Sequence, residues 1–234
     1  MLRPTGMTRM QRVLKMQRRQ GNANNRKKRS KVRHSKADAL PETDLRKLIE
    51  EAKSEIFDEL VVTLSGYEGM REGEIAHMER GWIDFQKEEI TVPSEQPCRA
   101  IKGKPCSECI KKRDGIWKPK TLEGARVIPI RIQAKDVISR YFNAFRRVGC
   151  TRQTVYNHIT DVAKRVKLAK KVYPHSLRST SASLWGLTGI SAPSLCKIMG
   201  WKNITSALPY VTADTDTALK EAKAKDKKHF YGED

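Results

Sequence analysis

Basic, acidic and aromatic residues that could act on a phosphate group lie in four separate segments of the chain. The segments are residues 69–75 (GMREGEI), residues 117–121 (WKPKT) with 126–129 (RVIP) shortly after, residues 175–178 (HSLR), and residues 199–201 (MGW) with a tyrosine nine residues beyond the tryptophan. Cleavage of a phosphodiester needs a nucleophile, groups that stabilise the added negative charge, and a proton for the leaving oxygen. The four segments together contain a candidate for each task.

Two arginines and a histidine are suited to hold the phosphate. Arg71 and Arg178 can bind nonbridging oxygens in fork geometry, which a lysine does less well. His175 lies three residues before Arg178, so a helix would place both side chains on one face. Tyr210 supplies a phenol that can form a covalent bond to phosphorus. Because the arginines would supply the positive charge, this chemistry requires no metal.

Each of these residues also has an ordinary structural interpretation. Arg71 and Glu74 could form a surface ion pair worth about 0.3 kcal/mol. His175 could simply begin a helix, and Trp201 and Tyr210 could pack in a core. Taken singly, the structural interpretation is favoured for every one of them. Their joint order along the chain reverses that preference.

Together the segments resemble the tyrosine recombinase family, over about residues 40–212. The family pattern has an arginine just after a helix-ending glycine, an acid three residues on, a hairpin lysine, a His-x-x-Arg helix, a Gly-His or Gly-Trp pair, and a tyrosine nine residues further. All of these features occur here in that order. The resemblance implies the fold of the family's catalytic domain, which is mainly α with a small antiparallel β-sheet (α+β).

The resemblance also implies a role for each matching residue. Arg71, His175 and Arg178 would clamp the scissile phosphate, and Tyr210 would attack it to leave a 3′-phosphotyrosyl bond. Because that bond conserves the energy of the broken one, rejoining would need no ATP. The sequence accordingly has no Gly-x-x-x-x-Gly-Lys phosphate loop.

Three further residues complete the implied site. Lys120 would protonate the departing 5′ oxygen. Lys118 is the alternative, but the following threonine and the spacing to Arg126 favour Lys120. Trp201 stands where many members have histidine and some have tryptophan. Glu74 would orient the site without reacting.

The apolar pattern predicts a mainly helical domain with one small sheet. Apolar residues recur at helical spacing between residues 45 and 64, which predicts two consecutive helices ending near Gly66 or Gly69. Further helices are predicted at 134–147, 151–170 and 174–187, short helices at 191–199, 203–211 and 214–228, and strands at 90–93, 116–118 and 125–130.

Positive charge is concentrated at the amino-terminal end of the chain. The sequence has 47 Lys+Arg and 27 Asp+Glu, a formal charge of +20, of which residues 1–37 hold thirteen basic and no acidic residues. We therefore predict a disordered basic arm at residues 1–37, a catalytic domain at 38–213, and a helix or tail at 214–234 that could dock on a neighbouring subunit.

The same charge indicates the class of partner. A strongly basic protein favours a polyanion, with nucleic acid ahead of an anionic membrane surface. The sequence shows no apolar run long enough to span a membrane and no signal peptide. We therefore expect a cytoplasmic, nucleoid-associated protein that does not act in a membrane.

Three of the five cysteines lie in an insertion at residues 94–115 of the predicted hairpin. They are Cys98, Cys106 and Cys109, the last two forming a C-x-x-C motif. A tetrahedral zinc site needs a fourth ligand. It could come from one of three residues elsewhere: His77, Cys150 or Asp114. A structural zinc remote from the reaction is one interpretation, and three reduced thiols on a mobile loop is the other.

The resemblance implies a recombinase or integrase of mobile DNA that exchanges strands of double-stranded DNA as a synaptic homotetramer and requires no cofactor. The cysteine insertion, together with the WKPKT and MGW segments, is most like integrases of archaeal viruses and plasmids. A noncatalytic DNA-binding protein that kept the fold and a type IB topoisomerase are the alternatives. Most members also carry an amino-terminal helical domain of about a hundred residues that embraces DNA, and the sequence leaves open whether a longer protein contains it.

Overall fold

The computed structural model describes residues 35–211 and residue 223 of the chain. Its helices are η1 (Ser35–Asp38), α2 (Glu42–Ala52), α3 (Ile56–Gly66), α4 (Glu72–Ala76), η2 (Arg80–Trp82), α5 (Ser107–Arg113), η3 (Leu122–Gly124), α6 (Ile132–Ala144), α7 (Arg152–Val166), α8 (Pro174–Gly186), α9 (Ala192–Met199), η4 (Ile204–Ser206) and α10 (Leu208–Val211). Its strands are β1 (Ile83–Asp84), β2 (Glu89–Val92), β3 (Gln96–Pro97), β4 (Ile116–Trp117) and β5 (Arg126–Pro129). Among these described residues, no helix is long and apolar enough to cross a membrane.

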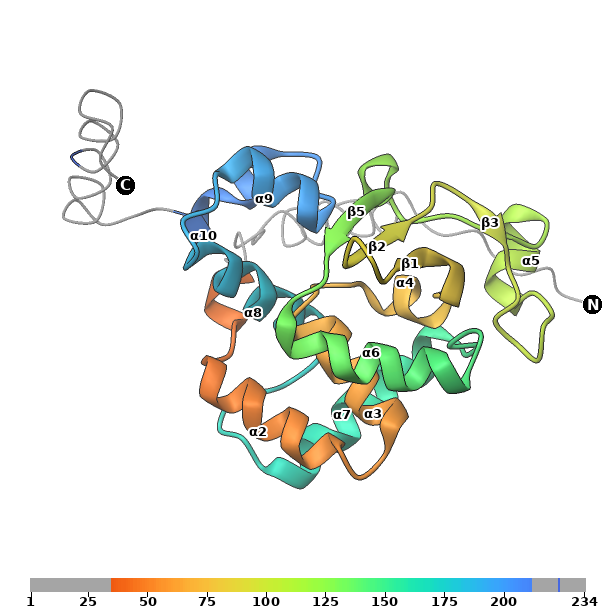
Figure 1. Cartoon of the computed structure of the whole chain (residues 1–234), viewed down its shortest axis with the longest axis horizontal. Coiled ribbons are helices and arrows are strands. Elements are labelled where there is room, and N and C mark those ends of the chain that lie inside the picture. The colour runs from red at the N-terminus through yellow and green to blue at the C-terminus, as the bar shows by residue number, and fades with distance from the viewer. Residues whose placement is uncertain (1–34, 212–222, 224–234) are drawn as a thin grey trace, which may run out of the picture. The chain divides into compact units, whose positions relative to one another are not determined.

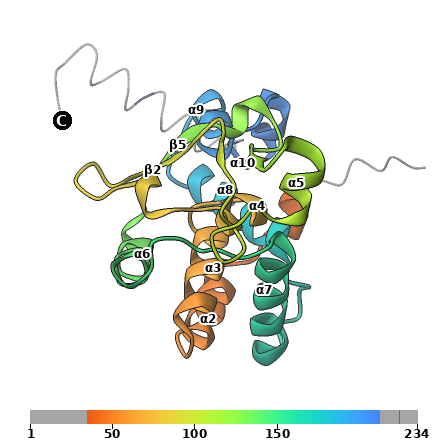
Figure 2. The same ribbon diagram turned by 90° about the vertical axis from the view of Figure 1, so that its right-hand side faces the viewer.

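Helices α2 and α3 follow the spacing predicted for residues 45–64. Helix α2 has acidic residues in its first turn and buries one face through Leu45, Leu48 and Ala52. Helix α3 is buried on nearly all sides, since residues 58–66 are all buried. It packs against α2, α6, α7 and α8 and forms the centre of the helical layer, as Figures 1 and 2 show.

The strands form two small antiparallel sheets rather than the single sheet predicted. Strand β2 lies between β1 and β5, with Ile90 opposite Ile128, and both of these side chains are buried. The predicted strand at residues 116–118 does not join this sheet. It is β4, and it pairs with β3, with Trp117 opposite Gln96. Strands β3 and β4 therefore form a separate pair at the two ends of the insertion, which the sequence analysis did not predict.

Helices α8, α9 and α10 bring the carboxy-terminal segments against the sheet and α3. Helix α8 begins with Pro174 at its first position, as predicted, and packs against α3, η1 and α10. Helix α9 contacts β5, so the turn after Met199 lies beside Arg126. Figure 1 shows this group at one side of the sheet, with α8 closest to the helical layer.

Several predicted boundaries change in the structure. The predicted helix at 203–211 is divided into η4 and α10, and the one predicted at 214–228 lies outside the described residues except residue 223. The end of the predicted arm, residues 35–37, belongs to η1, which packs against α8, while the rest of the arm lies outside the described residues. Helices α4 and α5 were not predicted, because they are too short to show a helical period.

Candidate active site

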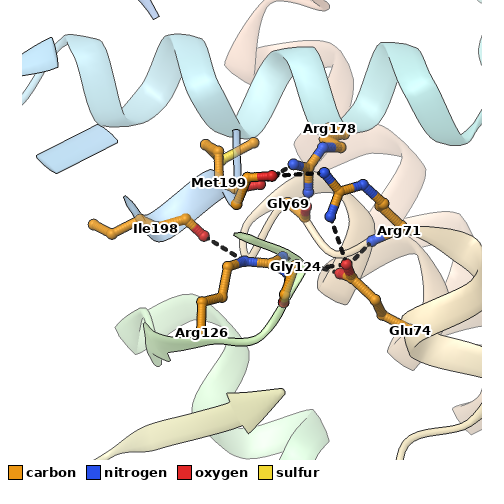
Figure 3. Close-up of polar contacts among 9 residues, drawn as sticks. Gly69, Arg71, Glu74, Gly124, Arg126, Arg178, Ile198 and Met199 are labelled. Carbon is orange, nitrogen blue, oxygen red and sulfur yellow. Dashed lines mark hydrogen bonds and ion pairs between the residues drawn. The ribbon is translucent and has the colours of Figure 1, made fainter. Parts of the chain in front are cut away.

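Glu74 is the centre of a buried network of charges at the start of α4. Its side chain is 2% exposed and accepts hydrogen bonds from both Arg71 and Arg126. Arg126 holds the carboxylate with both ends of its guanidinium, each nitrogen lying 2.9 Å from one carboxylate oxygen. Figure 3 shows the three side chains converging from α4 and β5. A bidentate pair of this kind fixes the orientation of both groups.

Arg71 connects this network to the end of α9. Its backbone N–H donates to Glu74 at 2.9 Å, which satisfies an otherwise unpaired N–H at the start of α4. Its guanidinium donates to Glu74 at 2.7 Å and to the carbonyl of Gly200 at 2.8 Å. Gly200 has a φ of +59°, and a Cβ there would lie 2.6 Å from the carbonyl oxygen of Glu123. Glycine is therefore required at this turn.

Arg178 is buried beside Arg71 and is held by backbone carbonyls. One nitrogen of its guanidinium donates to Gly69 and the other to Met199, as Figure 3 shows. Burial, followed by the positive charges of Arg71 and Arg126, lowers the pKa of Arg178 below its usual value. An anion bound next to it would remove this penalty.

The network carries more positive than negative charge. Burial alone would raise the pKa of Glu74, but Arg126, with the help of Arg178 and Arg71, lowers it to about 2. One carboxylate therefore faces three guanidinium groups, which leaves two positive charges uncompensated. A site with this balance stabilises a phosphate and the further negative charge of a phosphorane-like transition state.

Tyr210 closes the site from α10. Its side chain is 5% exposed and its ring stacks on Trp201 at 5.6 Å between centroids, with 26° between the planes. Trp201 in turn lies 5.9 Å from the guanidinium carbon of Arg178. A Cβ at Gly186 of α8 would lie 2.0 Å from the carbonyl oxygen of Tyr210, so only glycine allows α10 to dock here. The stacking on Trp201, which itself lies near Arg178, places the phenol ring near that arginine, and the charge of Tyr210 acts on Arg178.

His175 lies near Arg178, and both His175 and Lys120 are exposed. His175 is exposed on the first turn of α8, and partial loss of hydration together with Arg178 lowers its pKa. Lys120 is exposed in the loop between β4 and β5. Its competitor Lys118 is engaged in an ion pair with Glu95 at 2.7 Å, whereas Lys120 makes no ion pair within residues 35–211. The role of Lys120 stays a prediction.

Arg126 is the member of the site that sequence reasoning missed. Its side chain is 4% exposed, and it also donates to the carbonyl of Ile198 at 2.7 Å, so it joins α4, β5 and α9. A signal was present in the sequence. Arg126 and the buried Ile128 are two residues apart on a predicted strand and share one face of it. A charged residue on a buried face requires a buried partner, which is Glu74.

The three cysteines of the insertion lie together, but away from this network. Cys98, Cys106 and Cys109 are free thiols and all three are buried. His77, at the end of α4, is the candidate fourth ligand that joins them, and the ligand atoms of the four residues all lie within 4.8 Å of one another. The other two candidates, Cys150 and Asp114, are not part of this cluster.

The sequence of residues 38–216 matches the phage integrase family. Because this match covers well over half of the 234 residues, the chain belongs to the phage integrase family. A search of curated proteins found no match.

Solved structures of recombinases share the fold. XerA recombinase has 22% identity and a TM-score of 0.56 over 81% of this chain and 63% of that chain. The Tn1549 transposon integrase in complex with transposon right end DNA has 20% identity and a TM-score of 0.59 over 80% and 65%. XerH site-specific recombinase bound to difH substrate has 12% identity and a TM-score of 0.54 over 79% and 53%. The likeness confirms the predicted fold class, while the chain spans less than two thirds of each of these proteins.

Proposed function

We propose that this chain is a site-specific DNA recombinase that cuts and rejoins double-stranded DNA through a 3′-phosphotyrosine intermediate on Tyr210. The observation that carries this proposal is the convergence of Arg71, Arg178 and Tyr210, from distant segments, on one site with excess positive charge. Membership of the phage integrase family supports it. So do the Tn1549 integrase and XerH, both of which are bound to DNA in their solved structures.

In the proposed reaction, the oxygen of Tyr210 forms a bond to phosphorus while the bond from phosphorus to the 5′ oxygen breaks. The phenolic proton passes to solvent, directly or through neutral His175, and Lys120 gives a proton to the leaving 5′ oxygen. Arg71 and Arg178 stabilise the negative charge that builds up on the nonbridging oxygens. Attack by the 5′-hydroxyl of another strand reverses these steps and returns the proton to Tyr210.

Glu74 and Arg126 act as positioning residues in this scheme. They touch no reacting atom, but they fix Arg71 and the turn after α9 relative to each other. Trp201 positions the phenol by stacking on it. The guanidinium groups supply the charge stabilisation that a metal ion gives in other phosphoryl-transfer enzymes, and the phosphotyrosyl bond stores the energy for rejoining. The proposed reaction therefore needs neither a metal ion nor ATP.

We also infer a homotetramer on DNA during synapsis, with residues 214–234 docking on a neighbouring subunit. These residues lie outside the described part of the chain apart from residue 223, so the docking stays a prediction. The resemblance to integrases of archaeal viruses and plasmids, the integration of a viral genome or other mobile element, and the association with the nucleoid also stay predictions. DNA binding by the basic residues 1–37 would be strongly salt-dependent.

A nicked suicide substrate tests the proposed function directly. The DNA carries the chain's own recombination site, found from sequences that flank its gene, and loses a short strand fragment on cleavage so that religation fails. We expect a covalent protein–DNA adduct with the wild-type chain. No adduct, with DNA binding intact, would favour a noncatalytic DNA-binding protein. Relaxation of any supercoiled plasmid without site preference would favour a type IB topoisomerase.

A further inference from the structure

The cysteine–histidine cluster has the dimensions of a tetrahedral metal site. The Nε2 atom of His77 lies 3.7 Å from the sulfur of Cys106 and 3.6 Å from that of Cys109. Zinc bonds of about 2.3 Å to sulfur and about 2.0 Å to nitrogen put such atoms about 3.5 Å apart in a tetrahedron. With Cys98 as the fourth corner, the donor atoms all lie within 4.8 Å of one another. The fold therefore places four donors around a space of the size of a metal ion.

The hydrogen bonds around the cluster orient its donors. The Nδ1 atom of His77 lies 2.8 Å from the carbonyl oxygen of Gly73. Because a carbonyl only accepts, Nδ1 carries the proton and the lone pair of Nε2 points to the sulfurs. Trp117 stacks on the same imidazole at 5.3 Å, and the backbone N–H of Cys106 donates to the sulfur of Cys98 at 3.3 Å. Partners of this kind surround the ligands of metal sites.

We propose that His77, Cys98, Cys106 and Cys109 bind a structural zinc ion. Three thiolates and an imidazole are soft to intermediate ligands that suit zinc and exclude magnesium and calcium, which prefer oxygen. All four residues are buried, and four protein ligands leave no position for water or substrate. A closed site of this type stabilises a fold and does not take part in a reaction.

The zinc would add to contacts that already join the insertion to the end of α4, where Gln96 donates to the carbonyl of His77 and Trp117 stacks on its ring. His77 directly follows α4, while Cys98 follows β3 and the other two cysteines belong to the start of α5. The insertion has only short elements of its own, with two residues in each of β3 and β4. Small structures of this kind gain their stability from metal ions or disulfides when they cannot bury a large core. The ion would therefore fix the insertion to α4.

The anchored insertion leads into the loop of Lys120. Arg113, at the end of α5, donates to the carbonyl of Lys118 at 2.6 Å, two residues before Lys120. Strand β4 ends directly before Lys118. The zinc would thus fix the start of the loop that carries Lys120. Its effect on catalysis rests on the proposed function. Metal binding itself does not depend on that function.

Metal analysis of the untagged, full-length chain, expressed with added zinc, tests the site. We expect one zinc per chain, and, after exchange for cobalt, the visible absorption of tetrahedral cobalt bound to thiolates. Cys106→Ser and His77→Ala should each lose the metal, and Cys196→Ser, whose thiol is remote from the cluster, should keep it. A wild-type chain without zinc and without the cobalt spectrum would overturn the proposal, as would stoichiometric zinc in Cys106→Ser.

A second measurement uses the wild-type chain alone, so that folding defects of variants do not matter. The metal is removed with a strong chelator and amide hydrogen exchange is compared before and after. We expect faster exchange in residues 94–120 and little change in α2 and α3. Unchanged exchange in residues 94–120 after loss of the metal would disprove the anchoring role. Neither result depends on DNA cleavage, so failure of the proposed function would be seen separately.

Discussion

The arginine network and the cysteine–histidine cluster lie at opposite ends of α4. They differ in the charge of the ligand that each would bind. The network around Glu74 has two positive charges in excess, which an anion would balance. The cluster at His77 gathers sulfur and nitrogen donors, which a cation would balance. The network draws residues from four distant segments, whereas three of the cluster's ligands come from one insertion. One five-residue helix thus connects the proposed active site to the proposed metal site.

The sharpest way to break this comparison is to remove the nucleophile. Tyr210→Phe should abolish the covalent adduct and lower cleavage by at least about a thousandfold, because the phenolic oxygen is the only atom removed. DNA affinity and zinc content should stay at the wild-type values. Denaturing gels of the suicide substrate give the adduct, and filter binding gives the affinity. An adduct that survives in this variant would place the nucleophile elsewhere.

The second prediction concerns the carboxylate that the arginines share. Glu74→Gln removes one partner of a buried ion pair, so the free energy of unfolding should fall by about 3–5 kcal/mol at neutral pH. The matched control is Glu50→Gln, whose pair with Lys53 is exposed and whose loss should leave the free energy of unfolding almost unchanged. Denaturant unfolding of both variants measures the difference, and equal stabilities would show that the network is not structural.

The pH dependence of the same variant follows from the pKa of Glu74. That pKa is about 2 in the folded chain and near its ordinary value of 4.5 in the unfolded chain. Ionised Glu74 therefore stabilises the folded chain fully above pH 4.5, and this stabilisation is lost as the pH falls from 4.5 to the folded-state pKa of about 2. The gap between wild type and Glu74→Gln should accordingly narrow below pH 4.5. A gap that stays constant down to pH 3 would contradict this assignment.

A smaller loss of cleavage is expected when a lysine replaces Arg178, because the positive charge remains but the planar guanidinium is lost. Arg178→Lys should lower cleavage about a hundredfold, because the three N–H groups of an ammonium cannot serve both backbone carbonyls and two phosphate oxygens, whereas a guanidinium has five N–H groups. Arg140→Lys is the control, since Arg140 pairs with Glu59 on α3, away from the site. Single-turnover cleavage rates of the two variants measure the difference. Equal rates would show that Arg178 does not take part in the proposed reaction.

The smallest effect is expected when the other region is disturbed. Removal of the metal with a chelator should lower the cleavage rate by no more than about tenfold, because only the placement of Lys120 changes. Cleavage by the Cys196→Ser variant should respond to the chelator in the same way as the wild type. Complete loss of DNA binding on chelation would show instead that the two regions form one folding unit and that the comparison drawn above is wrong.

Residue patterns predicted the long elements and the arginine site better than the insertion. The apolar spacing of α2 and α3 reflects burial in a large core, which the sequence shows directly. Arg71 and Arg178 occur in family motifs with fixed spacing, whereas Arg126 lies outside them. Helix α5 was missed because Cys109 is its only buried residue, so no period could appear. His77 could not be selected as the fourth ligand, since it reaches the cysteines only through the packing of α4 against the insertion.

The imbalance of charge around Glu74 has a consequence for work with the purified chain. A buried group of arginines with two positive charges in excess is expected to bind small tetrahedral oxyanions from solution, and inorganic phosphate or sulfate resembles the phosphodiester of the proposed reaction. Buffers that contain them should compete with DNA for the arginines and raise the melting temperature at the same time. A stabilising buffer would then be an inhibitory one.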